Sequence, residues 1–320
     1  TCALPICASR VRFGAAGDFL RGLERYRNRL PVWAGELYLE LHRGTLTTQA
    51  LVKRANRKLE HELRAVEMLW SCLSLDKYPQ EDIDDIWKTV LLNQFHDIIP
   101  GSSITEVYRV THEQHEQALD RCRRLIQEAG ALLGERDENN LTLFNSLHYT
   151  YDGAVTLPEK WSGCCVKDDE GHELPCQTAN GRSVVRVVIP PYSFLTLCKV
   201  EKTPPKVADL DELVLENDLI RYEFNRQGQL IGAFDKEKNR AVIDSGKPGN
   251  VLTLYEDFPN AWDAWDVDVF YRDVPLETAT VVEVKAVEAG PVLSRLSMKY
   301  HLGTSTIIQN VSLGRGSRRL

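Results

Sequence analysis

The sequence lacks the clustered basic charge that a nucleic-acid-binding face needs. Its 320 residues hold 39 Lys and Arg against 46 Asp and Glu, a formal net charge of −7 at pH 7. The few basic runs, such as residues 121–124, are short and lie among acidic residues. Because phosphate backbones are gripped by grouped Lys and Arg, we exclude nucleic acid as a partner.

Long apolar runs are also missing. No stretch approaches the roughly 20 apolar residues that a membrane-spanning helix needs, and no segment has the layout of a signal peptide. There is no long-range repeat and no low-complexity tract. We therefore expect a globular protein with no membrane partner.

The eight cysteines form no CxxC pair and no repeated spacing. Those patterns would indicate a zinc ribbon or a disulfide framework. Cys72 and Cys122 take apolar positions in helical patterns, where free thiols pack as small hydrophobic groups. The pattern predicts free thiols in a reducing compartment rather than a disulfide scaffold.

A helical pattern governs the first part of the chain. Residues 16–28 predict a short amphipathic helix that Pro31 ends. A long helix is predicted from Thr47, and its apolar stripe has spacings of three and four residues. The stripe comprises Leu51, Ala55, Leu59, Leu63, Val66, Trp70 and Leu73.

Two more long helices are predicted after that one. The second begins near Pro79, runs into His96 and Asp97, and breaks at Pro100-Gly101. A capping-box pattern at residues 103–106 opens the third, which ends near Gly134. Three long helices with short connections predict a three-helix bundle.

After residue 140 the apolar period changes to two, which indicates strands. The predicted strands are short and closely spaced, so the sheets are expected to be antiparallel. They cover residues 141–145, 153–157, 164–166, 183–189, 193–200, 213–217, 220–225, 230–235, 278–287, 293–300 and 306–313.

The fold class is therefore α+β multidomain: a three-helix bundle followed by antiparallel β-sandwich domains, the second incomplete. We expect an uncertain start over residues 1–15, of which the first seven match no element. A helical domain over 16–138, a small β domain over 139–204 and the start of a larger β-sandwich over 205–320 follow. A strand-like run with no closing partner precedes residue 314, so we expect a piece of a longer protein.

The adjacent His96 and Asp97 stand where a helix breaks, so their side chains can point into a cleft. An imidazole is a good Zn²⁺ ligand and a carboxylate can hold sugar hydroxyls. A hydrogen-bonded structural pair at a helix end is the alternative. Zinc needs three or four ligands, and no HExxH or similar spacing supplies them here.

Two further segments carry candidate site residues. Residues 30–49 have no consistent period and contain Glu36, Glu40, His42 and Arg43. Paired carboxylates are the apparatus of glycoside hydrolysis. The alternative is that both are solvated or pair with Arg43 or Arg54.

The other segment is rich in turns and holds two tryptophans among acidic residues. Aromatic faces and carboxylates together are how proteins grip sugar rings. The alternative is a loop whose tryptophans cover a sheet core. The candidates here are Trp262, Asp263, Trp265 and Asp266.

Taken together, the motifs resemble those of a known family. Residues 93–103 (NQFHDIIPGSS) are similar to a signature of the retaining, zinc-dependent α-mannosidases of glycoside hydrolase family 38. Residues 35–48 and Trp262–Asp266 resemble its cytosolic and bacterial branch. The three motifs occur in the family's order, and the resemblance covers residues 10–320.

The resemblance implies a zinc ligand at His96 and a sugar contact at Asp97. It implies that His42, Arg43 and residues 262–266, hence Trp262, Asp263, Trp265 and Asp266, lie near the substrate. The nucleophile, the acid/base carboxylate and two zinc ligands are expected in an N-terminal α/β domain that this chain lacks. No catalytic residue is therefore assigned, and the chain alone is expected to be inactive.

The implied activity is hydrolysis of terminal α-linked mannose from an oligosaccharide, with Zn²⁺ as cofactor and a cytoplasmic location. A homo-oligomer is left open. The alternative is a non-catalytic carbohydrate-binding or accessory module, which the tryptophan cluster and the β regions would also fit.

Overall fold

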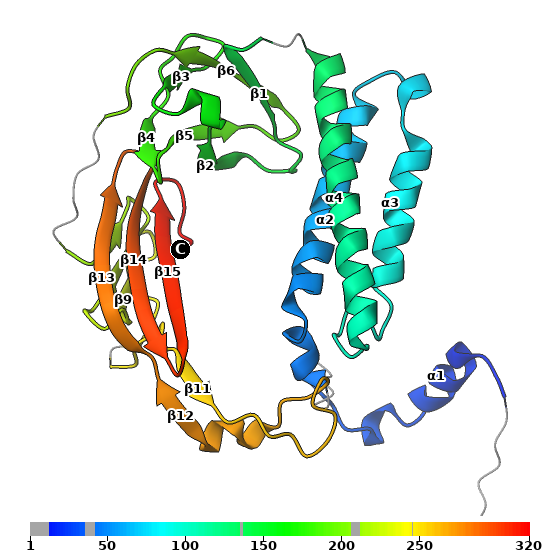
Figure 1. The fold of residues 1–320 in the computed structure, drawn as a ribbon. Helices are drawn as coiled ribbons and strands as arrows, with labels where there is room; N and C mark the ends of the chain where they lie inside the picture. The colour runs from blue at the N-terminus through cyan, green and yellow to red at the C-terminus, as the bar shows by residue number, and fades with distance from the viewer. Residues whose placement is uncertain (1–12, 36–41, 135–136, 206–211, 245) are drawn as a thin grey trace, which may run out of the picture. The chain divides into compact units, whose positions relative to one another are not determined.

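The computed structural model describes residues 13–35, 42–134, 137–205, 212–244 and 246–320. The chain divides into two units, residues 1–40 and 41–320. The first contains helix α1 (Ala16–Glu24) and a 3-10 turn (Arg27–Arg29) (Figure 1). The helix predicted over residues 16–28 therefore ends four residues early and continues as that turn. None of the unit's described residues is buried.

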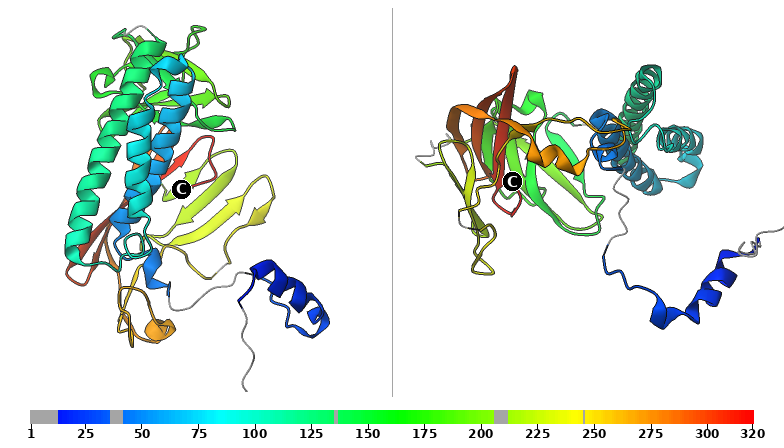
Figure 2. Two further views of the ribbon diagram at one scale, coloured as in Figure 1. Left: turned by 90° about the vertical axis from the view of Figure 1, so that its right-hand side faces the viewer. Right: turned by 90° about the horizontal axis from the view of Figure 1, so that it is seen from below.

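The second unit begins with three long helices that pack side by side, as both figures show (Figures 1 and 2). They are α2 (Ala50–Ser71), α3 (Gln80–Asn93) and α4 (Thr105–Leu133). The predicted three-helix bundle is confirmed. No described helix is both long enough and apolar enough to cross a membrane. The shared core comprises Leu59, Leu63, Val66, Leu69, Trp70, Ile83, Ile86, Val90, Ala118, Cys122, Leu125 and Ala129.

The apolar stripe of α2 was predicted one residue out of place at its start. Leu51 is exposed, whereas Val52 and Asn56 are buried. Asn56 faces inward because its side chain accepts a hydrogen bond from Gln94, the residue that follows α3, and donates one to Glu60. This end of the bundle is joined by polar contacts, so apolar spacing does not identify its inward face.

The predicted capping box is wrong. Ile104 is the N-cap of α4, and no side chain caps the helix. The Ser103 hydroxyl instead donates to the Asp97 carbonyl at 2.6 Å, while Glu106 pairs with Arg109. Helix α3 also stops at Asn93, so His96 and Asp97 lie in the turns that follow it. The serine therefore stabilises the turn rather than the helix.

His115 is a polar residue inside the bundle. It is 2% exposed, and neither ring nitrogen has a hydrogen-bond partner in the described part of the chain. Burial lowers the pKa of His115 from its ordinary value of 6.5, and His112 lowers it further. Above about pH 6.5 the ring is neutral in both folded and unfolded chains. Below it, the unfolded chain takes up a proton that the folded chain resists.

We expect the bundle to lose stability as the pH falls below about 6.5, and His115→Leu to remove this part of the pH dependence. The substitution should also raise the free energy of unfolding at pH 7 by about 1 kcal/mol, since it removes a buried polar ring without partners. Thermal unfolding followed by circular dichroism at 222 nm, at pH 5.5 and 7.5, measures both effects. His61→Gln, an exposed histidine of α2, is the control. An unchanged pH dependence in His115→Leu would refute the assignment.

A small β domain follows the bundle. One antiparallel sheet has the order β1-β6-β3 and the other β2-β5-β4. Their bounds are β1 Asn140–Phe144, β2 Tyr151–Thr156, β3 Cys165–Lys167, β4 Cys176–Ala179, β5 Arg182–Ile189 and β6 Phe194–Val200. The sheets share one core of Leu157, Trp161, Val166, Val185, Val187, Ile189 and Leu197. The predicted antiparallel sandwich is confirmed.

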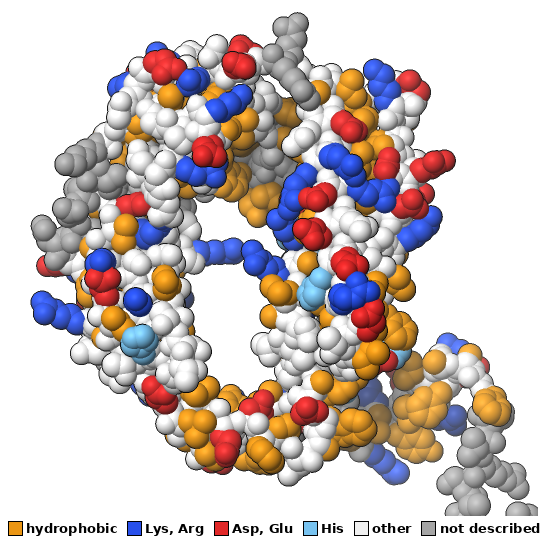
Figure 3. Space-filling view, in the orientation of Figure 1, with side chains coloured by type: hydrophobic (Ala, Val, Ile, Leu, Met, Phe, Trp, Pro, Cys, Tyr) orange, Lys and Arg blue, Asp and Glu red, His pale blue; other side chains and the backbone are white. Residues whose placement is uncertain are grey.

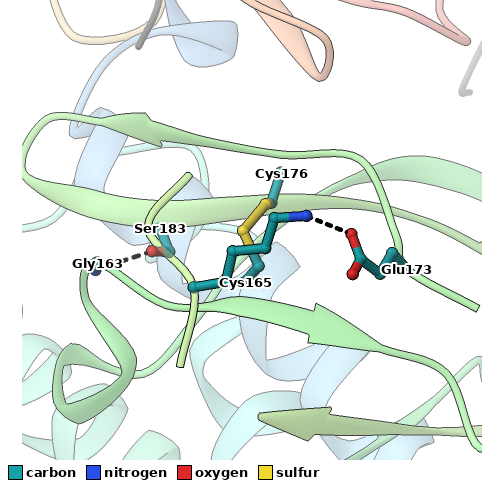
Figure 4. Close-up of a disulfide and its surroundings, with 6 residues drawn as sticks. Gly163, Cys165, Glu173, Cys176 and Ser183 are labelled. Carbon is teal, nitrogen blue, oxygen red and sulfur yellow. Dashed lines mark hydrogen bonds and ion pairs between the residues drawn. A yellow bond between two sulfur atoms is a disulfide. The ribbon is translucent and has the colours of Figure 1, made fainter. Parts of the chain in front are cut away.

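The two sheets are also joined covalently. A disulfide links Cys165 of β3 to Cys176 of β4, with the Cα atoms 6.0 Å apart (Figure 4). The prediction of free thiols is therefore wrong for this pair. The prediction of an apolar site for Cys72 is also wrong, because Cys72 is exposed just past α2, whereas Cys122 is buried as predicted. The spacing of Cys165 and Cys176 matches no framework pattern, so pairing depends on the fold.

The remaining β region forms a second sandwich. A sheet of order β10-β9-β8-β7 and another of order β13-β14-β15 share a core. Their bounds are β7 Val214–Glu216, β8 Ile220–Phe224, β9 Leu230–Asp235, β10 Arg240–Ala241, β13 Thr280–Ala289, β14 Leu293–Leu302 and β15 Ser305–Gly314. A two-stranded ribbon of β11 (Thr253–Tyr255) and β12 (Pro275–Thr278) completes the described strands.

Candidate functional site

The first part of the site is the histidine turn, residues 95–103, which follows α3. The chain bends there because the Ile98 and Ile99 amides donate to the Phe95 carbonyl at 2.8 and 3.1 Å. His96 and Asp97 project from this bend, with side chains 75% and 46% exposed. His96 Nε2 lies 3.5 Å from Asp97 Oδ2. The imidazole and the carboxylate are thus neighbours and open to a ligand.

Side chains from the bundle hold the backbone of this turn. The Tyr108 hydroxyl of α4 lies 3.3 Å from the Asp97 and Ile98 carbonyls and accepts from the Ser103 amide at 2.8 Å. The Ser103 hydroxyl donates to the Asp97 carbonyl as well. Because Tyr108 is buried, the turn is fixed to a rigid element, which is how binding groups are kept in place.

The second part is the Gly44 loop, residues 42–48, which contacts a segment more than 200 residues later. We call that segment, residues 262–268, the tryptophan segment. The amides of Gly44 and Thr45 donate to the Trp265 carbonyl at 2.9 and 3.3 Å. The His42 and Trp265 rings meet edge to face with centroids 5.4 Å apart. Arg43 donates to the Val267 carbonyl at 3.4 Å.

This contact depends on glycine at position 44. A Cβ there would lie 2.9 Å from the Asp266 nitrogen and 3.0 Å from the Trp265 carbonyl carbon. Both atoms are backbone and cannot swing aside as a side chain does. The two segments resemble the same family in the sequence, and the structure brings them together.

The Gly44 loop in turn contacts the histidine turn. Gly101 has φ +96°, and a Cβ there would lie 2.7 Å from the Thr48 carbonyl oxygen. Lys53 of α2 donates to the same Thr48 carbonyl and to the Ile99 carbonyl, the latter at 2.6 Å. Within the loop, the Thr48 hydroxyl donates to the Gly44 carbonyl at 2.8 Å. A chain of contacts thus joins all three segments.

The tryptophan segment presents its predicted residues differently. Trp262 has φ +62° and is 65% exposed, and Asp263 is exposed too. Asp266 is 7% exposed, and its carboxylate accepts from the Val267 amide at 3.0 Å. Figure 3 shows hydrophobic side chains gathered with acidic ones over the segment between β11 and β12. Trp262 and Asp263 are therefore open to a ligand, whereas Asp266 faces the protein.

A metal ion requires more than this chain's described residues provide. In residues 13–35, 42–134, 137–205, 212–244 and 246–320, no three His, Cys, Asp or Glu side chains are grouped to hold one. His96, exposed at a rigid turn, fits the role of a single ligand. Since zinc takes three or four protein ligands, the others would have to come from elsewhere. Glu36 and Glu40, the predicted carboxylate pair, lie outside the described residues.

Sequence reasoning missed the residues that assemble the site. Lys53 and Tyr108 contact the histidine turn, but neither stands out in the sequence, and Thr48 was only the last position of the 35–48 motif. Lys53 lies in a run with Arg54, Arg57 and Lys58 that reads as a solvated helix face. Only Gly44 and Gly101 gave a signal, since glycine often marks a close approach of two backbones.

Two family models match the chain. The alpha mannosidase middle domain matches residues 40–133, and the glycosyl hydrolases family 38 C-terminal domain matches residues 215–320. The first includes the Gly44 loop and the histidine turn, and the second includes the tryptophan segment. All three contacting segments therefore lie inside the matched regions.

Curated relatives and solved structures agree with these matches. Alpha-mannosidase G of Dictyostelium discoideum is 29% identical, over 91% of this chain and 30% of that protein. Alpha-mannosidase 2C1 of Homo sapiens is 32% identical, over 84% of this chain and 25% of that protein. The chain thus spans between a quarter and a third of the length of these relatives.

The fold is shared with a glycosyl hydrolase family 38 protein from Enterococcus faecalis. The TM-score is 0.62 at 19% identity, over 93% of this chain and 45% of that one. An alpha-mannosidase from the V583 strain of that species gives a TM-score of 0.60 at 20% identity, over 89% of this chain and 39% of that one. At these identities the likeness concerns the fold alone.

Proposed function

Because this chain belongs to glycosyl hydrolase family 38, we propose that it forms one wall of the active site of a zinc-dependent α-mannosidase. The observation that carries the proposal is the joining of the Gly44 loop, the histidine turn and the tryptophan segment into one cluster. Contacts link these three segments although they lie far apart in the sequence, and two of the segments carry exposed side chains, His96 in one and Trp262 and Asp263 in the other. The substrate class is an oligosaccharide that ends in α-linked mannose.

Each side chain has a role that suits its chemistry. His96 supplies a neutral imidazole nitrogen to the metal, and Asp97 accepts hydrogen bonds from sugar hydroxyls. The exposed face of Trp262 stacks on a sugar ring, with Asp263 beside it. His42 and Arg43 hold Trp265 and Val267, and Asp266 supports the backbone of the tryptophan segment. His42, Arg43 and Asp266 therefore orient the segment that carries the residues that touch the substrate.

The reaction that the family resemblance supports is hydrolysis with retention. In such a reaction a carboxylate nucleophile forms a glycosyl-enzyme, which water then hydrolyses. Bound zinc would supply positive charge that orients sugar hydroxyls. This chain contributes binding and orientation, and the nucleophile belongs to residues outside it. We propose, accordingly, that the 320 residues alone are inactive.

A carbohydrate-binding module without catalysis is the second candidate, favoured by the exposed Trp262 and Asp263. It gives no role to His96, which lies at a turn that backbone contacts and the side chains of Ser103, Tyr108 and Lys53 hold. The two candidates differ in metal dependence, since a module of this kind needs no metal ligand at His96.

The proposal is tested by His96→Ala in the longer polypeptide that it requires. We expect zinc affinity to fall by more than the roughly tenfold to hundredfold that the loss of a group supporting a metal ligand costs, and mannoside hydrolysis to fall with it. Zinc titration followed by elemental analysis measures the first. His61→Ala, an exposed histidine of α2, is the control. Equal zinc content in wild type and His96→Ala would refute the ligand role of His96. Hydrolysis by the 320 residues alone would refute the proposal that the nucleophile lies outside them.

The cellular location stays a proposal. The resemblance to the cytosolic branch favours the cytoplasm, whereas the Cys165–Cys176 disulfide is a bond that a reducing compartment disfavours. Alkylation of native protein, followed by intact mass, tells whether this pair is reduced where the protein acts.

A further inference from the structure

Lys53 bridges two backbone segments of the site. It lies in the first turn of α2, and its ammonium donates to the Thr48 carbonyl of the Gly44 loop and, at 2.6 Å, to the Ile99 carbonyl of the histidine turn. The two carbonyls belong to segments 51 residues apart in the sequence. A single cationic group therefore connects the segment of His42 and Arg43 with that of His96 and Asp97.

The environment of this lysine differs from that of an ordinary surface lysine. The side chain is half-buried, and burial lowers the pKa of Lys53 below its usual 10.5. No carboxylate of the described residues forms an ion pair with it, so its polar partners are carbonyl oxygens. Two of the three ammonium donors are used. The ammonium thus loses part of its hydration and donates instead to backbone carbonyl oxygens.

We propose that Lys53 is a positioning residue that fixes the histidine turn against the Gly44 loop, and so sets the direction of His96 and Asp97. The inference rests on the proposed function only for the roles of His96 in metal binding and of Asp97 in sugar binding. The linkage itself rests on the contacts of Lys53 and on the packing of Gly101 against Thr48.

A positive charge suits this place better than a neutral donor. The Thr48 and Ile99 carbonyls both point at the ammonium, and their negative ends would repel each other without it. Hydrogen bonds from a charged donor are stronger than neutral ones. Removal of the ammonium would also leave two half-buried carbonyls without their donor, which is the costly case for a hydrogen bond.

Lys53→Met keeps the length of the side chain and removes the charge. We expect amide exchange in peptides that cover residues 44–50 and 96–104 to quicken about tenfold or more, as the loss of charged hydrogen bonds implies. Exchange in β5 should stay unchanged. Hydrogen–deuterium exchange with mass spectrometry on the 320-residue chain measures this.

Lys58→Met is the matched control, since Lys58 is an exposed lysine of the same helix. Lys53→Arg is the rescue variant, because guanidinium also donates to two carbonyls while keeping the charge. In the longer polypeptide, the apparent affinity for Co²⁺ can be measured by titration followed through the absorption of the bound ion. We expect this affinity to fall about tenfold in Lys53→Met, to recover in Lys53→Arg and to keep the wild-type value in Lys58→Met.

Several outcomes would overturn the proposal. They are wild-type exchange of both segments in Lys53→Met, an equal effect of Lys58→Met, or fast exchange in a folded Lys53→Arg. If Lys53→Met does not fold, the arginine variant alone decides. The two proposals fail in different ways. If His96 is not a metal ligand, His96→Ala binds metal as the wild type does, and the exchange experiment on Lys53→Met still tests the linkage by itself.

Discussion

A Gly101→Ala protein is expected to lose about 3 kcal/mol of the free energy of unfolding of its helical bundle. Two costs combine. At φ +96° a residue with a Cβ is strained by about 1–3 kcal/mol, and the Cβ would meet the Thr48 carbonyl oxygen at 2.7 Å. Relief requires the histidine turn to move away from the Gly44 loop, which breaks the Lys53 bridge. Overpacking of this kind costs about 1–3 kcal/mol.

The two costs are separable by a matched glycine. Gly171 has φ +90° and no atom within 4 Å of a Cβ built on it, so Gly171→Ala measures strain alone. Urea unfolding with pulsed hydrogen exchange measures the stability of the helical bundle and of the small β domain separately, because each domain has its own peptides. If Gly101→Ala loses no more stability in its domain than Gly171→Ala loses in its own, the contact with Thr48 contributes nothing.

Local periodicity was enough to predict most elements of this fold. The helices α2, α3 and α4 and the long strands β5, β13, β14 and β15 carry apolar spacings of 3.6 or 2 over many residues, because one face of each is buried. The strands that were missed, β4, β10, β11 and β12, have at most four residues. A strand of two to four residues carries at most two repeats of the period, so its signal is weak, and its pairing depends on distant partners.

Polar residues inside the bundle explain why apolar spacing alone does not identify its inward faces. Tyr108, Thr111 and His115 form the buried face of the first half of α4, whereas the apolar Val110 in the same stretch is exposed. Tyr108 is buried because its hydroxyl contacts the histidine turn. A residue that serves the site can thus take a core position that apolar periodicity does not assign to it.

The candidate site was predictable in its parts but not in its assembly. A broken helix and a chemically apt pair drew attention to His96 and Asp97, and an aromatic-acidic cluster drew attention to Trp262 and Asp266. Nothing in local sequence says that Gly44 touches Trp265. That contact exists because the intervening β domains return the chain to the bundle, and such long-range closure has no local signal.

Gly44→Ala is expected to separate the Gly44 loop from the tryptophan segment, at a cost of about 2–3 kcal/mol. Its Cβ would press on the Asp266 nitrogen and the Trp265 carbonyl carbon, at 2.9 and 3.0 Å. The amides of Gly44 and Thr45 would then lose the Trp265 carbonyl that they share. The edge-to-face contact of His42 with Trp265 would be lost with them. We expect the longer polypeptide to bind sugar more weakly, with KM raised more than kcat is lowered.

Gly130→Ala is the control for this substitution, because Gly130 lies inside α4 with no atom within 4 Å of its added Cβ. Alanine there should stabilise the helix by up to about 1 kcal/mol, so the two glycines should respond in opposite directions. Amide exchange in peptides covering residues 42–48 and 262–268 follows the separation directly. If the two backbones are in close contact, amide exchange should become faster in both peptides of Gly44→Ala. Unchanged exchange in both would mean that the two motifs meet too loosely to form one wall of a site.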